Sequence, residues 1–172
     1  MDYLKNLVRT VPGFPKEGII FRDVTSVLQD PEGLQGSINT MSEKLEGIDF
    51  DIVIGPESRG FIYAAPLAYN MKKGFVLARK AGKLPAEKIS KSYQLEYGEA
   101  TIEIHKDAIK KGQKIVIADD LLATGGTCKA VCELVEEFGA KVVASVFFIE
   151  LLEINGRASL EPHCEVFSII KY

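Results

Sequence analysis

The chain has 172 residues, 47% hydrophobic and 26% charged, which is ordinary for one globular domain with a buried core. Its net charge of −3, with no long basic run, argues against nucleic acid as the main partner. No apolar stretch nears the roughly 20 residues of a membrane-spanning helix. The first residues lack a signal-peptide core, and three cysteines without metal-ligand spacing favour reduced thiols. We therefore expect a single-domain cytoplasmic protein without membrane contact.

The N-terminal part begins with a predicted short helix at residues 2–10. Two prolines and two glycines make residues 11–18 an irregular loop. The apolar run that follows, 19–25, is short and extended, and an edge strand explains it without any functional role.

A helix is predicted to start at Asp30 and Pro31, because aspartate is a good N-cap and proline suits the first helical position. Its periodicity indicates a purely structural helix. The expected buried stripe comprises Leu34, Ile38, Met41 and Leu45.

A strand at residues 50–55 ends in a Pro-Glu-Ser-Arg-Gly turn and is followed by a helix at 61–71. This turn places Arg59 at the carboxyl end of the strand, where open α/β sheets bind ligands. Guanidinium is a natural partner for phosphate oxygens, although a surface arginine would look the same in sequence. A third strand is predicted at 74–79.

Residues 80–92 are basic, polar and short of apolar periodicity. Long loops of this kind are functional or solvated, and the sequence leaves both readings open. Alternating segments at 93–98 and 100–104 predict a hairpin around Gly98 and Glu99. A basic hairpin would suit a lid over a pyrophosphate.

The most informative stretch is residues 114–127, which reads Lys-Ile-Val-Ile-Ala-Asp-Asp-Leu-Leu-Ala-Thr-Gly-Gly-Thr. A buried strand is expected to end at the acidic pair, Asp119 and Asp120. A helix pattern with Cys128, Val131 and Leu134 on one face follows the loop.

The loop at 123–127 has features of an anion site. Gly125 and Gly126 let backbone N–H groups approach an anion, while Thr124 and Thr127 add hydroxyl donors at a helix N-terminus. The preceding carboxylates suit the vicinal hydroxyls of a ribose, or a metal held partly through water. The stretch therefore predicts a ribose 5-phosphate site, and it matches neither a Walker A loop nor a dinucleotide fingerprint.

Further strands are predicted at 141–149 and 165–170, so strands alternate with helices along the chain. This order predicts an α/β fold with a mainly parallel central sheet and helices on both faces. His105 and His163 lie outside the expected site. Cys128 and Cys132 are four residues apart, and packing explains them better than half of a metal site.

The string Ile115 to Thr127 closely resembles the phosphoribosyl pyrophosphate (PRPP) motif of type I phosphoribosyltransferases, in the form of the adenine-specific members. The segment Phe-Pro-x-x-Gly-Ile-Ile-Phe-Arg-Asp at 14–23 resembles their base-binding hood. Arg-Lys-x-Gly-Lys-Leu-Pro at 79–85 and Leu-Glu-Tyr-Gly at 95–98 resemble their catalytic loop. The resemblance implies the type I fold, with a hood at about 11–27 and a flexible hairpin lid at about 80–98.

The resemblance also implies a function: adenine and PRPP give AMP and pyrophosphate in purine salvage, through an oxocarbenium-like transition state. Mg²⁺ would be held mainly by PRPP and water, with no direct protein ligand, and the protein would form a homodimer. A phosphoribosyltransferase for another base and a non-catalytic regulator with the same fold are the alternatives.

The resemblance assigns site residues by ligand. Glu96 and Arg59 would be catalytic, with Glu96 near purine N7, and Asp119 and Asp120 would hold the ribose. The remaining implied contacts are Ala123, Thr124, Gly125, Gly126 and Thr127 for the 5′-phosphate, Arg59, Lys80, Lys83 and Tyr97 for pyrophosphate, and Ile20, Phe21 and Arg22 for adenine.

Overall fold

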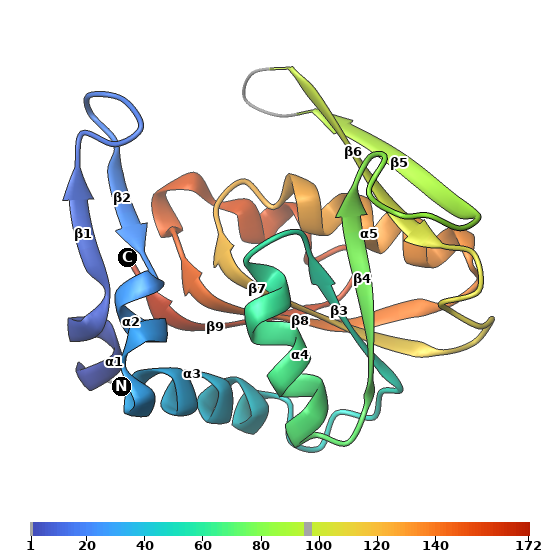
Figure 1. Cartoon of the computed structure of the whole chain (residues 1–172), viewed down its shortest axis with the longest axis horizontal. Helices are drawn as coiled ribbons and strands as arrows, with labels where there is room; N and C mark the ends of the chain where they lie inside the picture. Colours follow the sequence, from blue (N-terminus) through green and yellow to red (C-terminus); the bar gives the residue numbers. More distant parts are fainter. Residues whose placement is uncertain (1, 95–97) are drawn as a thin grey trace.

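A seven-stranded sheet forms the centre of the protein in the computed structural model, which describes residues 2–94 and 98–172 (Figure 1). Its strand order is β5-β6-β4-β3-β7-β8-β9. The strands are β3 (Ile52–Pro56), β4 (Gly74–Lys80), β5 (Lys88–Gln94), β6 (Glu99–His105), β7 (Lys114–Leu122), β8 (Lys141–Glu150) and β9 (Glu165–Lys171). In this spatial order, neighbouring strands are parallel from β4 through β3, β7 and β8 to β9. Strand β6 is antiparallel to both of its neighbours, β4 and β5. The predicted mainly parallel sheet is confirmed.

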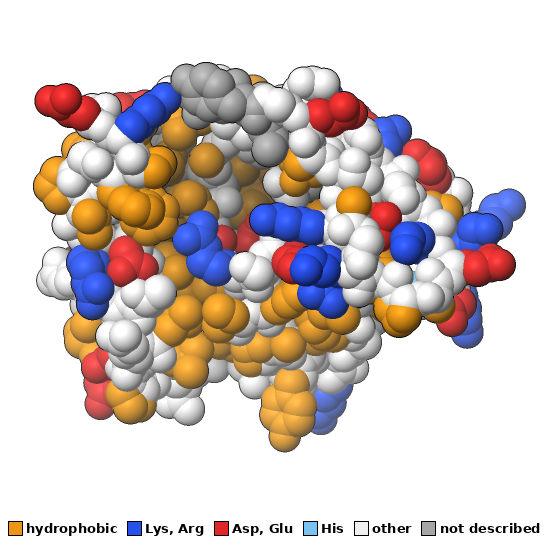
Figure 2. Space-filling model, turned by 45° about the horizontal axis from the view of Figure 1, so that its top comes forward, with side chains coloured by type: hydrophobic (Ala, Val, Ile, Leu, Met, Phe, Trp, Pro, Cys, Tyr) orange, Lys and Arg blue, Asp and Glu red, His pale blue; other side chains and the backbone are white. Residues whose placement is uncertain are grey.

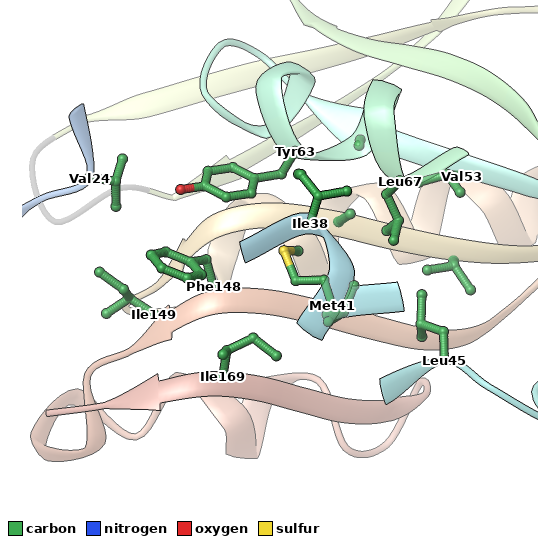
Figure 3. Packing of buried hydrophobic residues seen from close by; sticks show 14 of the residues in the cluster. Val24, Ile38, Met41, Leu45, Val53, Tyr63, Leu67, Phe148, Ile149 and Ile169 are labelled. Atoms are coloured by element: carbon green, nitrogen blue, oxygen red, sulfur yellow. The ribbon is translucent and has the colours of Figure 1, made fainter. Parts of the chain in front are cut away.

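Helices cover both faces of this sheet, as predicted. They are α1 (Asp2–Leu7), α2 (Thr25–Gln29), α3 (Pro31–Lys44), α4 (Gly60–Asn70) and α5 (Gly126–Glu137), with short 3-10 turns η1 (Leu152–Ile154) and η2 (Gly156–Ser159). Alternate side chains of β7 divide between two hydrophobic clusters: Val116 joins the cluster under α3 and α4, and Ile117 joins the cluster under α5. Figure 3 shows the first cluster, in which α3 side chains meet those of α4 and β8.

The start of α3 is formed as the sequence predicts. The Asp30 carboxylate accepts a hydrogen bond from the backbone N–H of Gly33 at 2.7 Å, and Pro31 occupies the first turn. The predicted burial is confirmed for Ile38, Met41 and Leu45. It is wrong for Leu34, which is 36% exposed. Leu34 lies in an open groove between α3 and α4 instead of under the helix.

The hood is a separate two-stranded antiparallel sheet, β1 (Arg9–Pro12) and β2 (Ile20–Asp23). The predicted helix at 2–10 is therefore too long, because α1 ends at Leu7 and the chain then pairs with β2. The predicted loop at 11–18 likewise loses its first residues to β1. Proline is tolerated at the end of such a short edge strand. The peptide bond between Phe14 and Pro15 in the connecting turn is cis.

The lid segment contains more regular structure than its composition suggests. The predicted loop at 80–92 is wrong from Lys88 onward, where β5 begins and pairs with β6 along its whole length. Ile89 and Tyr93 pack against the cluster under α5, and Lys91 between them reaches Glu133 at 3.2 Å. Lys91 therefore faces α5 at a position where a strand pattern would have an apolar residue. The sequence of β5 for this reason lacks a clear alternation of apolar and polar residues.

The two hairpins, β1–β2 and β5–β6, rise on either side of the carboxyl ends of the central strands (Figure 1). Among the described residues, no helix is both long and apolar enough to cross a membrane.

Candidate active site

The acidic pair lies within β7 and not after it, because the strand continues to Leu122. Pairing with β3 stops at Ile117, so Asp119 and Asp120 lie beyond the paired part of these two strands. The backbone N–H of Asp120 donates to the Asp119 carboxylate at 2.8 Å. Asp120 is 5% exposed. Two carboxylates thus stand together at the carboxyl edge of the sheet.

Burial raises the pKa of the Asp119 carboxyl well above its usual value, and the neighbouring Asp120 charge adds to this effect. Burial also raises the pKa of Asp120, although a nearby guanidinium opposes the shift. A positive charge or hydroxyl donors at this site would therefore stabilise the ionised forms of the two carboxylates.

Arg59 supplies part of that charge. Its Nε lies 2.6 Å from Oδ2 of Asp120, in the turn between β3 and α4. The sequence predicted Arg59 and the acidic pair at the same crevice but not their direct contact. The turn approaches β7 closely, since a Cβ added to Gly60 would lie 2.8 Å from Oδ1 of Asp119. The peptide bond between Glu57 and Ser58 in this turn is cis.

Glu57 holds the turn against β4. Its carboxylate accepts from Nε of Arg79 at 3.2 Å and from the backbone N–H of Lys80 at 3.0 Å. Burial raises the pKa of Glu57, but the bonds from Arg79 and Lys80 outweigh it and lower the pKa overall. Glu57 was not among the expected site residues, because a lone glutamate beside an arginine carries no recognisable pattern.

A cavity of 340 Å³ opens beside these groups, and ligand pockets in proteins have volumes of about 300–1,000 Å³. Its lining includes five of the predicted site residues; the members are Glu57, Ser58, Arg59, Lys80, Asp119, Asp120, Leu121 and Thr127. Figure 2 shows the hollow on this face, with basic and acidic side chains side by side at its edge.

The predicted anion loop encloses a smaller cavity of 100 Å³ next to the first one. The cavities share Asp119, Leu121 and Thr127 in their linings, so they adjoin one another. Gly125 has a φ of +79°, which a residue with a side chain rarely adopts. All five predicted loop residues line the small cavity, together with Leu122, Cys128 and Phe147. The N-terminus of α5 therefore faces a small open cavity of phosphate size.

The loop is backed by η2, which sequence reasoning did not connect with the site. A Cβ on Gly156 would overlap the carbonyl oxygen of Ala123, so the two backbones touch. Ser159 Oγ donates to the carbonyl oxygen of Gly156 at 2.7 Å and lies 3.4 Å from that of Thr124. The single available signal was the glycine, Gly156, in the connector before the last strand.

The hood brings its aromatic side chain to the same opening. The Phe21 ring centre lies 5.8 Å from the guanidinium carbon of Arg59, and Phe14 contacts the ring edge-on at 5.2 Å between centroids. Arg22 turns the other way: its guanidinium lies 3.8 Å from the centre of the Tyr172 ring and donates to Thr10 Oγ1 at 2.7 Å. Phe21 alone among the predicted base-site side chains faces Arg59.

A third cavity, of 320 Å³, lies between the hood and the C-terminal segment. The expected residues Ile20 and Arg22 line it, together with residues that the sequence did not bring forward, namely Gly18, Ile19, Leu151, Glu153, Ile154 and Tyr172. In the sequence, only the apolar residues of the connector pointed to this part of the lining, and that signal is weak. One of them, Ile154, is 47% exposed in the structure.

One described residue that was predicted for the pyrophosphate site does not line these cavities. Lys83 is exposed and does not line any of them, although its backbone carbonyl accepts from Arg79 at 3.3 Å. Glu96 and Tyr97 lie outside the described residues. Within residues 2–94 and 98–172, no cluster of three or more His, Cys, Asp or Glu side chains is arranged to hold a metal ion. His163 contacts Glu136 and is remote from the site lining.

The family model described as a phosphoribosyl transferase domain matches residues 23–170. The adenine phosphoribosyltransferase of Lachnoclostridium phytofermentans is 56% identical over 172 residues, which cover 100% of this chain and 98% of that protein. The chain belongs to the adenine phosphoribosyltransferase family.

Solved structures agree with this assignment. The crystal structure of adenine phosphoribosyltransferase from Thermoanaerobacter pseudethanolicus has a TM-score of 0.96 at 48% identity, and the match covers 99% of both chains. The enzyme from Saccharomyces cerevisiae, solved with an imino-altritol bisphosphate and adenine, has a TM-score of 0.90 at 38% identity over 97% of this chain and 96% of that one. The fold is thus the type I phosphoribosyltransferase fold.

Proposed function

We propose that the enzyme transfers the ribose 5-phosphate group of PRPP to adenine, which gives AMP and pyrophosphate in purine salvage. One observation carries this proposal: the anion loop and the acidic pair with Arg59 line two adjoining cavities. The adenine in the yeast structure and the shared family support adenine as the base.

The 5′-phosphate would bind in the loop at 123–127. Backbone N–H groups around Gly125 and Gly126, the hydroxyls of Thr124 and Thr127, and the α5 dipole all favour a dianion there. The loop would act as a fixed anchor, since η2 supports it from behind. The Ser159 hydroxyl of η2 lies 3.4 Å from the Thr124 carbonyl oxygen on the side of the loop away from the cavity.

Asp119 and Asp120 would accept hydrogen bonds from the ribose hydroxyls. As the bond to pyrophosphate breaks, positive charge develops on the ribose ring, and the carboxylates stabilise it in a poorly hydrated site. The Arg59 contact opposes the rise that burial causes in the pKa of Asp120 and so favours its ionised form.

Arg59 and Lys80 would stabilise the charge that develops on pyrophosphate, since both line the cavity beside the acidic pair. Because Arg59 contacts Asp120 without substrate, the guanidinium would bind both groups and orient one against the other. Lys83 and Tyr97 would reach the leaving group from the lid. Closing the site keeps water from the activated ribose.

Adenine would stack on Phe21, whose ring is held edge-on by Phe14. The backbone at Ile20 and Arg22 would read its polar edge, and carbonyl acceptors there suit a 6-amino group. Glu96 would exchange a proton near purine N7.

Mg²⁺ is the proposed cofactor. The acidic pair and Glu57 provide hard oxygen donors around the larger cavity, which fits a hydrated Mg²⁺ held mainly by PRPP. When bound, the ion would neutralise charge on the pyrophosphate.

We also propose a cytoplasmic homodimer. The family resemblance supports the dimer, and three free buried thiols support a reducing compartment. Sedimentation at two protein concentrations tests the assembly.

A competition assay tests the reaction and the base together. Equal adenine and hypoxanthine compete for limiting PRPP with Mg²⁺, and the AMP and IMP formed are counted. Hypoxanthine has an oxygen where adenine has its amine, so acceptor would face acceptor, and we expect a preference of about 10⁴. Comparable amounts of AMP and IMP would contradict the adenine assignment but not the transferase assignment.

A further inference from the structure

The lid strand β5 touches the anion loop through one side-chain contact. Thr127 Oγ1 donates to the hydroxyl oxygen of Tyr93 at 3.0 Å, and both side chains are partly buried. A Cβ placed on Gly126 would lie 3.6 Å from the Tyr93 ring and from the carbonyl oxygen of Gln94. β5 therefore lies directly against the first residues of α5.

Neighbouring contacts fix the position of the Tyr93 hydroxyl. The ring packs on the hydrophobic cluster under α5. Two residues earlier, Lys91 contacts Glu133 at 3.2 Å and Glu137 at 3.4 Å, both on α5. The Tyr93 hydroxyl is thus placed beside Thr127 by contacts that need no ligand.

A hydroxyl carries a single proton, so Thr127 cannot donate to Tyr93 and to a phosphate at once. A phosphate oxygen only accepts, and Thr127 must turn its proton toward the anion when the loop is filled. Tyr93 has its own proton and can donate it to the oxygen of Thr127. The two hydroxyls then form a chain toward the phosphate, in which each hydrogen bond strengthens the next.

We propose that Tyr93 is a positioning residue for the 5′-phosphate: its hydroxyl holds the Thr127 hydroxyl at 3.0 Å and donates to it when phosphate binds. This role rests on the proposed function, in which Thr127 contacts the phosphate. It also gives the lid strand a direct part in binding the substrate, separate from the basic residues at 80–83.

Calorimetric titration of the full chain with AMP, and with adenosine as the ligand without phosphate, tests the proposal. Tyr93→Phe keeps the packed ring and should weaken AMP binding about 3- to 10-fold with adenosine unchanged. Thr127→Val should weaken AMP at least as much, and adding Tyr93→Phe to it should cost nothing more. Thr127→Ser keeps the hydroxyl, so in that background Tyr93→Phe should still weaken AMP.

Ser92→Ala is the matched control, because it breaks a contact between two hydroxyls within the same hairpin, Ser92 and Thr101 at 2.9 Å, in which no loop residue takes part. If Tyr93→Phe binds AMP no worse than Ser92→Ala, or loses AMP and adenosine equally, the proposal is wrong. If Thr127→Val weakens AMP but Tyr93→Phe does not, only this inference fails. If Thr127→Val leaves AMP binding intact, the phosphate assignment fails and takes the inference with it.

Discussion

The two adjacent aspartates are chemically alike but have different surroundings. Asp120 contacts Arg59, whereas Asp119 receives its described hydrogen bond from a backbone N–H. Burial raises the pKa of both carboxyls, and only Asp120 has a guanidinium at contact distance to offset it. The buried Asp119 carboxyl therefore lowers the stability of the fold as the pH rises above the usual pKa of an aspartate.

Asp119→Asn should stabilise the protein while it lowers turnover. A folded-state pKa above the usual 3.8 gives a stabilising term that is present below that pH and lost as pH rises through the folded pKa. The Tm of the variant should equal that of wild type near pH 3.8, and the difference should grow as the pH rises. Each kcal/mol of unfolding free energy that the variant gains should raise its Tm by roughly 2–4 °C. Thermal unfolding from pH 4 to 8 measures this.

Asp120→Asn is the control for that experiment, because it also removes the contact with Arg59. It should gain little or nothing in Tm at neutral pH. A gain equal to that of Asp119→Asn would show that the Arg59 contact does not offset the burial of Asp120.

Arg59→Ala should lower turnover by about 10²–10³, because the proposed bonds from Arg59 to pyrophosphate would strengthen in the transition state. AMP lacks pyrophosphate, so its affinity should change much less. Steady-state kinetics and AMP titration measure the two effects, with Arg59→Lys as the control that keeps the charge but loses the planar fork. Parallel losses in turnover and AMP affinity would instead make Arg59 a base-site or structural residue.

At the scale of elements, a clamp joins β8, η2 and β9. Arg157 of η2 donates from Nε and Nη2 to the Glu150 carboxylate at 2.8 and 2.7 Å, and from Nη1 to the Val166 carbonyl at 2.6 Å. Ser168 of β9 also donates to Glu150. The Arg157 bonds, then the Ser168 bond, lower the pKa of Glu150 against the effect of burial.

Arg157→Ala should destabilise the fold by about 3 kcal/mol, near the lower end for a broken buried pair, because Arg157 is 26% exposed. A lowered carboxyl pKa stabilises above the usual 4.5 and loses this effect as pH falls. The wild-type advantage should therefore shrink below that pH. Urea unfolding at pH 7 and pH 4 measures it, with Arg157→Lys as control. An advantage independent of pH would contradict the charge pairing.

Elements with strong local signals were predictable from sequence. The anion loop carries its own glycines and hydroxyls, and α3 carries its own cap, so both formed as expected. β5 was missed because Lys91 occupies an inward position that only ion pairs with α5 explain. The backing by η2 was missed because contacts between Gly156 and Ala123 leave no trace in either segment alone. Tertiary partners decided both cases.

At the scale of the whole molecule, the proposed substrate spans two separate sheets. The ribose 5-phosphate would bind on the seven-stranded sheet, and the base would bind on the two-stranded hood. Binding of AMP would therefore link parts that no strand pairing connects within the described residues.

AMP at about 100 times its Kd should raise the unfolding free energy by about 2.7 kcal/mol. Phe21→Ala should reduce the shift at a fixed AMP concentration but leave the shift by ribose 5-phosphate unchanged, because the ring contacts only the base. Thermal unfolding with each ligand measures both shifts. A loss of the ribose 5-phosphate shift would place Phe21 at the sugar and not in the hood site.

The contact between Gly156 and Ala123 also bears on protein synthesis. A ribosome releases the loop at 123–127 well before residues 156–159, so a nascent chain holds the complete binding motif without its backing. Strand β8 must first add to β7, and the chain must then turn back beneath the loop. Affinity for phosphate should therefore arise late in translation, after the loop residues that bind it have already left the exit tunnel.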